Sequence, residues 1–187
     1  MNQINLNRFF YYTEIDSTQK EIWRRIEKET IEKGTVVVAE KQTSGIGTHG
    51  RVWHTDEENN IAFSFYIDLP INVKKLEGLT YEIAEIILEV FESLYKIKLA
   101  IKKPNDIVFN GKKLGGILTE TKLARETLKN LVIGIGINTN QIEFADDIKD
   151  IASSIRKKFG VSVDNNLFIK EFLKRFEDRF EKRIGEN

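Results

Sequence analysis

The chain has 187 residues, of which 41% are hydrophobic, and it carries 29 basic and 29 acidic side chains. This length supports one sizeable core, so residues 1–187 are interpreted as a single globular domain. A formal net charge of zero argues against a general affinity for nucleic acid or anionic membranes. The absence of cysteine excludes disulfides, a thiolate nucleophile and a zinc–thiolate site. No signal peptide or bilayer-spanning run is visible, so we expect a cytoplasmic protein.

The N-terminal part predicts a strand followed by a helix. Residues 9–15 form the strand, residues 16–18 (DST) after it offer helix caps, and Thr18 and Glu21 have the spacing of a capping box. We expect the helix to end at Gly34 and to bury three apolar side chains, Ile22, Trp23 and Ile26.

The next elements are two strands and the main helix. Residues 35–39 form a β-branched run typical of a buried strand, and residues 61–67 alternate as a further strand. From 76 to 94 the apolar residues recur at helical spacing, which predicts an amphipathic helix with a charged outer face.

The second half predicts a hairpin, another strand and a closing helix. Strand-like residues 98–102 precede residues 107–119, in which Asn110-Gly111 separates two apolar runs as a hairpin turn does. Residues 131–138 predict another strand, and residues 167–180 a helix. Strands in runs with segregated helices favour an α+β fold with a mixed or antiparallel sheet and flanking helices.

A glycine-rich segment, residues 42–53 (QTSGIGTHGRVW), is the first candidate site. Backbone N–H groups and the cation of Arg51 suit an anionic ligand. The segment also fits G-x-G-x-x-G, and Asp68 follows at a distance suited to binding a ribose. A dinucleotide loop must open a helix at once, and residues 51–60 have no helical apolar stripe, which decides against that interpretation. A plain surface hairpin loop is the simpler alternative.

A second segment, residues 102–106 (KKPND), places lysines beside a rigid polar turn. Pro104 fixes its own φ and biases Lys103 towards an extended conformation, so the turn can aim the lysines. A solvated strand lysine is the simpler interpretation of Lys102, and Asp106 can be purely structural. His49 and His54 have no identifiable partner and are given no role.

Five segments, in order, resemble the successive motifs of the biotin protein ligases (biotin–[acetyl-CoA-carboxylase] ligases): residues 16–19 (DSTQ), 42–53, 102–106, 113–118 (KLGGIL) and 134–138 (GIGIN). Residues 152–155 (ASSI) are similar to a late A-T-S-L segment of that family. The resemblance implies an α+β catalytic domain related to class II aminoacyl-tRNA synthetases and lipoate ligases.

The same resemblance implies a two-step activity. Biotin would be activated by Mg-ATP as biotinyl-5′-AMP, and a specific lysine of a biotin carboxyl carrier protein would then receive the biotinyl group. ATP, Mg²⁺ and biotin are therefore the expected substrates, with no tightly bound prosthetic group and no metal ion held directly by the protein. Lys102 and Arg51 are the expected catalytic residues.

The resemblance also assigns binding residues. Those expected to contact biotin are Ser17, Thr18, Gln42, Gly45, Gly115 and Gly116. Those expected to contact ATP or the adenylate are Gly47, Gly50, Arg51, Trp53, Asn105 and Asn138, the last by recognising adenine.

Two positions depart from the family pattern G-R-G-R-x-G-R, because Ile46 and Thr48 replace its first two arginines. We expect weaker retention of the adenylate and leaky biotinylation of nearby lysines. Lys103 likewise stands where the family commonly has tryptophan.

The domain organisation is expected to be minimal, without an N-terminal helix-turn-helix domain or a separate C-terminal β domain. Contact with nucleic acid or membrane is not expected, and the family makes a homodimer formed by sheet-edge pairing an open alternative. Two competing functions remain, a lipoate or octanoate–protein ligase on the same scaffold and a non-catalytic biotin-binding module.

Overall fold

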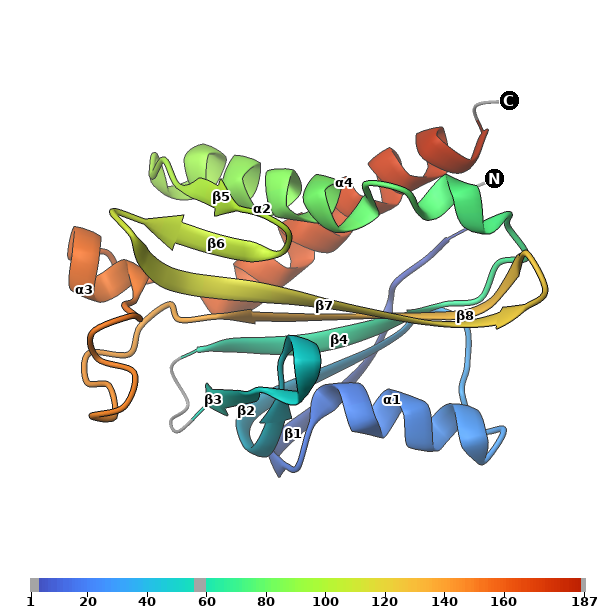
Figure 1. Ribbon diagram of the computed structural model, residues 1–187, viewed down its shortest axis with the longest axis horizontal. Coiled ribbons are helices and arrows are strands. Elements are labelled where there is room, and N and C mark those ends of the chain that lie inside the picture. The colour runs from blue at the N-terminus through green and yellow to red at the C-terminus, as the bar shows by residue number, and fades with distance from the viewer. Residues whose placement is uncertain (1–3, 56–59, 186–187) are drawn as a thin grey trace.

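The computed structural model describes residues 4–55 and 60–185, and Figure 1 shows its arrangement. The strands are β1 (Arg8–Ile15), β2 (Thr35–Ile46), β3 (Val52–Thr55), β4 (Ile61–Ile67), β5 (Ala100–Lys102), β6 (Asp106–Phe109), β7 (Lys112–Ala124) and β8 (Thr127–Ile137). The helices are α1 (Thr18–Glu27), α2 (Leu79–Tyr95), α3 (Ile155–Phe159) and α4 (Asn165–Gly185), with two 3₁₀ turns, η1 (Thr48–Gly50) and η2 (Val73–Leu76).

These strands form one sheet in the order β1-β2-β4-β8-β7-β6-β5, with β3 paired to β2 outside this path. The β1–β2 pair is parallel and the other pairs are antiparallel. Helices α2 and α4 cover one face of the sheet, whereas α1 and the β2–β3 hairpin lie on the other (Figure 1). The predicted α+β class with a mixed sheet and flanking helices is confirmed.

The main core lies between the sheet and the pair α2–α4. Helix α4 contributes four phenylalanines at helical spacing, each at most 1% exposed: Phe168, Phe172, Phe176 and Phe180. Phe172 and Phe176 meet the rings of Phe63 and Phe65 on β4, with centroid separations of 5.7 Å for Phe63–Phe172 and 4.9 Å for Phe65–Phe176. An ion pair of 2.8 Å between Glu89 and Arg179 joins the outer sides of the two helices. The predicted apolar stripe of the closing helix is therefore confirmed.

The opposite face of the central strands changes character along its length. Under α1, Tyr66 of β4 and Val132 of β8 pack with Ile22 in a small second core. Two residues further along the same strands, this face carries Ser64 and Gly134, which are paired across β4 and β8. The small side chains leave room there, beside the end of α1 that follows β1.

The predicted capping box of α1 is wrong. Ser17 is the N-cap, in an extended conformation, and its hydroxyl accepts from the Lys20 N–H. This shifts the helix start by one residue, so Glu21 cannot close the box and instead pairs with Arg24 and Arg25.

The predicted end of α1 at Gly34 is also wrong, because the helix ends at Glu27. Gly34 serves a different need, with φ of +78° and its backbone close to the N-terminal segment. A Cβ at this position would lie 2.0 Å from the Asn5 carbonyl oxygen. Of the three side chains expected to be buried on α1, Ile22 is buried, and Trp23 and Ile26 are half-buried.

Hydrogen bonds and an ion pair of Asp16 fix the start of α1 against β2. The Arg24 guanidinium donates to both carboxylate oxygens of Asp16 at 2.8 Å, and the Ser17 N–H donates to Asp16 Oδ1 at 2.8 Å. The Ser44 N–H donates to the Asp16 carbonyl oxygen at 2.9 Å. Hydrogen bonds from Arg24 hold the pKa of Asp16 below its usual range. Asp16 therefore fixes the positions of the two residues that follow it.

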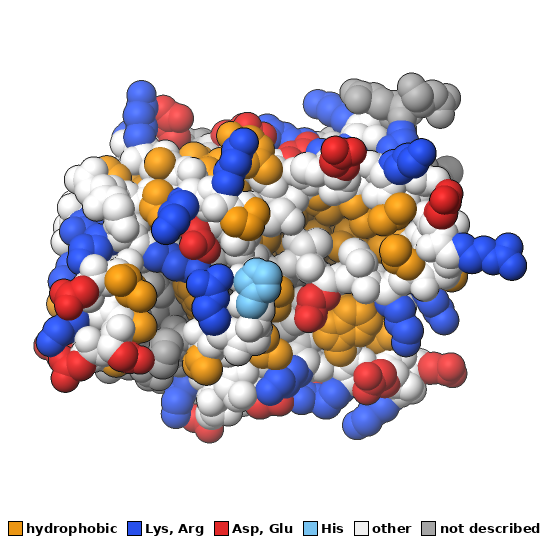
Figure 2. Space-filling view, in the orientation of Figure 1, with side chains coloured by type: hydrophobic (Ala, Val, Ile, Leu, Met, Phe, Trp, Pro, Cys, Tyr) orange, Lys and Arg blue, Asp and Glu red, His pale blue; other side chains and the backbone are white. Residues whose placement is uncertain are grey.

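Side chains of both charges intermingle over the face seen in Figure 2, as the balanced composition predicts. No helix in residues 4–55 and 60–185 has the length and apolar character needed to cross a membrane.

We predict that Phe172→Ala lowers the free energy of unfolding by about 3–5 kcal/mol, because a fully buried ring is replaced by a cavity. Leu167→Ala on the same helix is the control, since Leu167 is 48% exposed and should change stability by at most about 0.5 kcal/mol. Chemical denaturation monitored by circular dichroism measures both, and equal losses would contradict the packing described for α4.

We predict that Asp16→Asn lowers the melting temperature by a few degrees at neutral pH. Asp16 and Arg24 are 36% and 39% exposed, so solvent screening limits the contribution to about 0.5–1 kcal/mol. Because the folded pKa is depressed, this stabilisation is complete above the unfolded value of about 3.9 and is lost as pH falls through the folded pKa. Melting curves of both proteins between pH 7 and pH 3 should converge at the acid end, and a constant offset would contradict this assignment.

Candidate functional site

A cavity of about 450 Å³ lies between the start of α1, the β2–β3 hairpin, strands β7 and β8, and residues 138–152. Ten of the residues expected in the site line it: Ser17, Thr18, Gln42, Gly47, Arg51, Trp53, Lys102, Asn105, Gly116 and Asn138. Separate parts of the sequence thus meet in one hollow of ligand-binding size.

Hydroxyl and amide groups form one end of the cavity. Gln42 Oε1 accepts from the Thr18 N–H at 2.9 Å and from Thr18 Oγ1 at 3.2 Å. Thr18 Oγ1 also lies 2.8 Å from Ser64 Oγ. Because the Thr18 proton goes to Gln42, Ser64 acts as donor to Thr18 in this chain of bonds. Ser17 is 1% exposed and belongs to the same buried polar group. This group can supply hydrogen bonds to the polar end of a ligand.

Glycines form the floor beside it. Gly116 and Gly136 are directly paired across β7 and β8, and the indole of Trp53 lies on this backbone. A Cβ on Gly136 would stand 2.4 Å from Trp53 Cε2, so the indole requires glycine there. Trp53 Nε1 is buried and has no hydrogen-bond partner among the residues that the structure describes.

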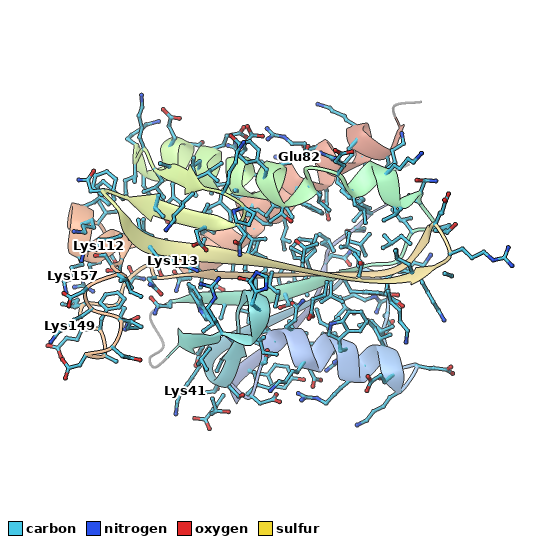
Figure 3. The ribbon with its side chains drawn as sticks, viewed as in Figure 1. Lys41, Glu82, Lys112, Lys113, Lys149 and Lys157 are labelled. Carbon is cyan, nitrogen blue, oxygen red and sulfur yellow. The ribbon has the colours of Figure 1, made fainter. Side chains whose placement is uncertain are left out.

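Three cations lie at the other end. Arg51 is held by its own turn, with Nε donating to the Thr48 carbonyl at 3.2 Å and Nη2 to Thr48 Oγ1 at 3.0 Å. Lys113, labelled on β7 in Figure 3, has its Nζ 2.7 Å from Asp106 Oδ1 and 5.6 Å from the centre of the Trp53 ring. Lys102 ends β5 opposite Asp106. These positive charges suit an anionic ligand.

The two neighbouring lysines of the 102–106 segment have different surroundings. Lys102 is exposed and lines the cavity, whereas the Lys103 ammonium lies 5.2 Å from the ring centre of Tyr81 on α2. Strand β5 ends at Lys102, and Lys103 already belongs to the turn that follows, which separates two residues that the sequence leaves equivalent.

Asn105 and Asn138 are buried and hold the frame of the cavity. Asn105 Nδ2 donates to the Ile117 carbonyl at 2.9 Å, joining the turn after β5 to β7. Asn138 Nδ2 donates to the Ser153 carbonyl at 3.1 Å. Each amide nitrogen is therefore engaged with backbone in this structure.

Gly45, Gly50 and Gly115 lie outside the cavity wall. A Cβ on Gly45 would be 2.4 Å from the Trp53 carbonyl oxygen, and one on Gly115 would be 3.0 Å from the Gly136 carbonyl oxygen, so both permit close packing behind the wall. Gly50 has φ of +73° in the turn of the hairpin. The hairpin loop expected from the sequence is thus also a wall of the site.

The cavity contains residues that sequence reasoning left without a role: Gln19, Ser64, Lys113, Gly134, Gly136, Phe144, Ile148 and Ile151. Gln19, Lys113 and the two glycines stood inside the quoted motifs, which is a signal that could have found them. Ser64 and the apolar residues of 144–151 carried no such signal.

His49 gains no role. His49 lies in the η1 turn with φ of +59° and does not line the cavity, and the side chain of His54 lies outside the described part of the structure. Nowhere in the described ranges do three or more histidine or acidic side chains gather as metal ligands would.

Comparisons with known proteins agree on one family. Residues 11–138 match the model of the Biotin/lipoate A/B protein ligase family. The bifunctional ligase/repressor BirA of Bacillus subtilis is 38% identical over 169 residues, which are 89% of this chain and 52% of that protein. The BirA of Bacillus spizizenii is 40% identical over the same shares. The chain thus spans about half the length of these curated relatives.

Solved structures give the same result. Biotin protein ligase from Aquifex aeolicus in complex with biotin and ATP superimposes with a TM-score of 0.79 at 32% identity, over 97% of this chain and 73% of that one. Biotin protein ligase from Leishmania major in complex with biotinyl-5-AMP gives a TM-score of 0.70 at 25% identity, over 94% and 76%. The chain therefore belongs to the biotin/lipoate A/B protein ligase family, and within it to the biotin protein ligases.

Proposed function

We propose that this chain is an ATP-dependent biotin–protein ligase that forms biotinyl-5′-AMP and transfers biotin to a lysine of a biotin carboxyl carrier protein. The observation that carries the proposal is the single cavity with a buried hydroxyl–amide group at one end and three cations at the other. An acyl adenylate has this distribution, with a polar head on the acid and a phosphate where acid and nucleotide join. The Aquifex relative with biotin and ATP supports the same assignment.

Biotin occupies the hydroxyl–amide end in this proposal. Ser17, Thr18 and Gln42 bond the ureido head, whose donors and acceptor would otherwise lose their bonds to water on burial. Gly116 lets the acid pass close to the backbone of β7, and Gly45 and Gly115 act by keeping the wall closely packed behind it.

The nucleotide occupies the cationic end. Arg51 and the backbone of Gly47 hold the phosphate, Gly50 allows the turn that places Arg51, and Trp53 separates this region from the glycine floor. Phe144 and Ile148 provide an apolar wall for the adenine ring, with Asn138 and Asn105 fixing the loops that surround the nucleotide. ATP brings Mg²⁺ as its bound complex.

The chemistry then needs charge stabilisation and alignment. A carboxylate oxygen of biotin attacks the α-phosphorus, and the bond to the bridging oxygen breaks, releasing pyrophosphate. The amine of the carrier lysine next attacks the acyl carbon, AMP departs with the phosphate oxygen, and the amine proton passes to solvent. Lys102, Lys113 and Arg51 stabilise the negative charge that gathers where carboxylate and phosphate meet.

The wider setting belongs to the same proposal. We place the protein in the cytoplasm, as a single catalytic domain over the residues of this chain, with a carrier domain as its partner. A homodimer formed through a sheet edge is compatible with this arrangement, because β1 and β5 are the two outer strands of the sheet within the described ranges 4–55 and 60–185.

We predict that the protein releases pyrophosphate from Mg-ATP when biotin is added but not when lipoate is added. Lys102→Ala and Lys113→Met should each reduce the rate roughly 100-fold or more, because each removes a charge at the reacting centre. Lys103→Ala is the matched control and should retain the wild-type rate, since its ammonium faces Tyr81.

Other outcomes identify the competing functions. Release that depends on lipoate or octanoate would establish the alternative ligase on this scaffold. Biotin binding without any pyrophosphate release would establish a binding module. Equal losses in Lys102→Ala and Lys103→Ala would remove the assignment of Lys102.

We predict that the wild-type protein labels bystander proteins with biotin, because Ile46 and Thr48 line the cavity without positive charge. The double variant Ile46→Arg and Thr48→Arg adds two cations beside the phosphate and should reduce bystander labelling roughly 10-fold while still labelling the carrier. Streptavidin blots of mixed proteins measure this, and tight adenylate retention by the wild type would contradict it.

A further inference from the structure

Gln19, the second residue of α1, has an amide whose orientation is fixed by its neighbours. Its Nε2 donates to Glu120 Oε2 at 2.9 Å and lies 3.4 Å from the Val132 carbonyl oxygen. The same carboxylate oxygen accepts from Trp23 Nε1 at 2.7 Å. An ionised carboxylate only accepts, so the nitrogen of Gln19 must face Glu120 and the carbonyl oxygen must face the other way.

That oxygen, Gln19 Oε1, is buried and has no hydrogen-bond partner among residues 4–55 and 60–185. Residue Gln19 as a whole is only 3% exposed, and it lines the cavity. Leaving a buried acceptor unsatisfied is costly, and such atoms in folded proteins are few. A ligand that seats beside it with a donor would remove this cost.

The surroundings of Gln19 Oε1 place it at the hydroxyl–amide end of the cavity. A Cβ on Gly134 would lie 2.6 Å from Gln19 Oε1 and 3.2 Å from Ser64 Oγ, so only glycine leaves space for the amide. Ser64 is bonded to Thr18, and Thr18 to Gln42. Gln19 thus stands next to the group that receives the head of the acid, and it adds an acceptor to that group.

We propose that Gln19 is a specificity-determining residue, whose Oε1 accepts a hydrogen bond from an N–H group on the head of the bound acid. This inference rests on the proposed function and extends it to the choice of acid. A cyclic urea carries N–H donors, whereas a dithiolane ring or an alkyl chain carries none. An acid without such a donor leaves the buried oxygen unpaired, and sites of this kind discriminate strongly against analogues that lack the group.

Glu120 is a positioning residue in this scheme. It has no need to touch the acid, because it acts by holding the Gln19 nitrogen away from the ligand. With a neutral amide at position 120, the Gln19 amide can turn over and present its NH₂ group, which cannot accept a bond from an N–H donor.

The test compares the binding of biotin and of lipoate to the full chain by calorimetry. Gln19→Met keeps the length of the side chain and removes the acceptor. Biotin should bind roughly 10-fold or more weakly to this variant, and lipoate should bind no more weakly than to the wild type, so the preference falls. Glu120→Gln should lower the preference in the same direction by a smaller factor.

Asn130→Leu is the matched control. Asn130 Oδ1 is also buried without a partner among the described residues, and its Nδ2 donates to Tyr66 at 2.9 Å, but Asn130 does not line the cavity. Removing this amide should leave the biotin-to-lipoate ratio unchanged. Thermal melts establish that each variant is folded.

The outcomes separate the two proposals. An unchanged ratio in folded Gln19→Met overturns the role of Gln19 and leaves the proposed function standing. If Gln19→Met does not fold, Glu120→Gln decides, and an unchanged ratio there overturns the inference. A wild-type protein that binds neither acid overturns the proposed function and, with it, this inference.

Discussion

The site depends on how the two faces of the sheet are covered. The central strands are covered on both faces, but different helices cover each face. Every residue of β4 is buried. One face of the sheet packs against α2 and α4 through large apolar side chains. The opposite face changes from Tyr66 and Val132 beneath α1 to Ser64 and Gly134 beside it. The cavity exists because α1 does not cover the part of this face where β4 and β8 carry the small residues Ser64 and Gly134.

The same constraint explains why the site is polar at one end and open at the other. A helix start brings unpaired N–H groups and small hydroxyl residues, and the Asp16–Arg24 pair fixes these against β2. Ser17 and Thr18 are thereby held in a buried setting in which their hydroxyls have defined partners. Away from α1, the β2–β3 hairpin and the lysines of the β5–β7 region meet solvent, where charged groups remain hydrated.

The positive charges lie at the open end of the site, in agreement with this division into a buried polar end and an open end. The chain as a whole is neutral, and yet Arg51, Lys102 and Lys113 converge on one cavity from three separate segments. Asp106 holds Lys113 beside the Trp53 ring. A local concentration of cations in a neutral protein favours a small anionic ligand over a polyanionic surface.

The sequence determined most of the elements, because periodicity, turn residues and motif spacing are local properties, and ten of the residues that it proposed for the site line the cavity. It predicted the main helices, the Asn110-Gly111 hairpin and two residues, Ser17 and Thr18, that line the cavity. It offered Ser17 among the possible caps, but the capping box of Thr18 and Glu21 and the end of α1 at Gly34 were wrong, since the start of the helix depends on where β1 ends. Only the tertiary structure decided that Lys102 and not Lys103 lines the cavity, and that Lys113 and Gln19 also line it. These choices depend on where a strand ends and on partners more than 90 residues away, such as Glu120 for Gln19, which no local pattern records.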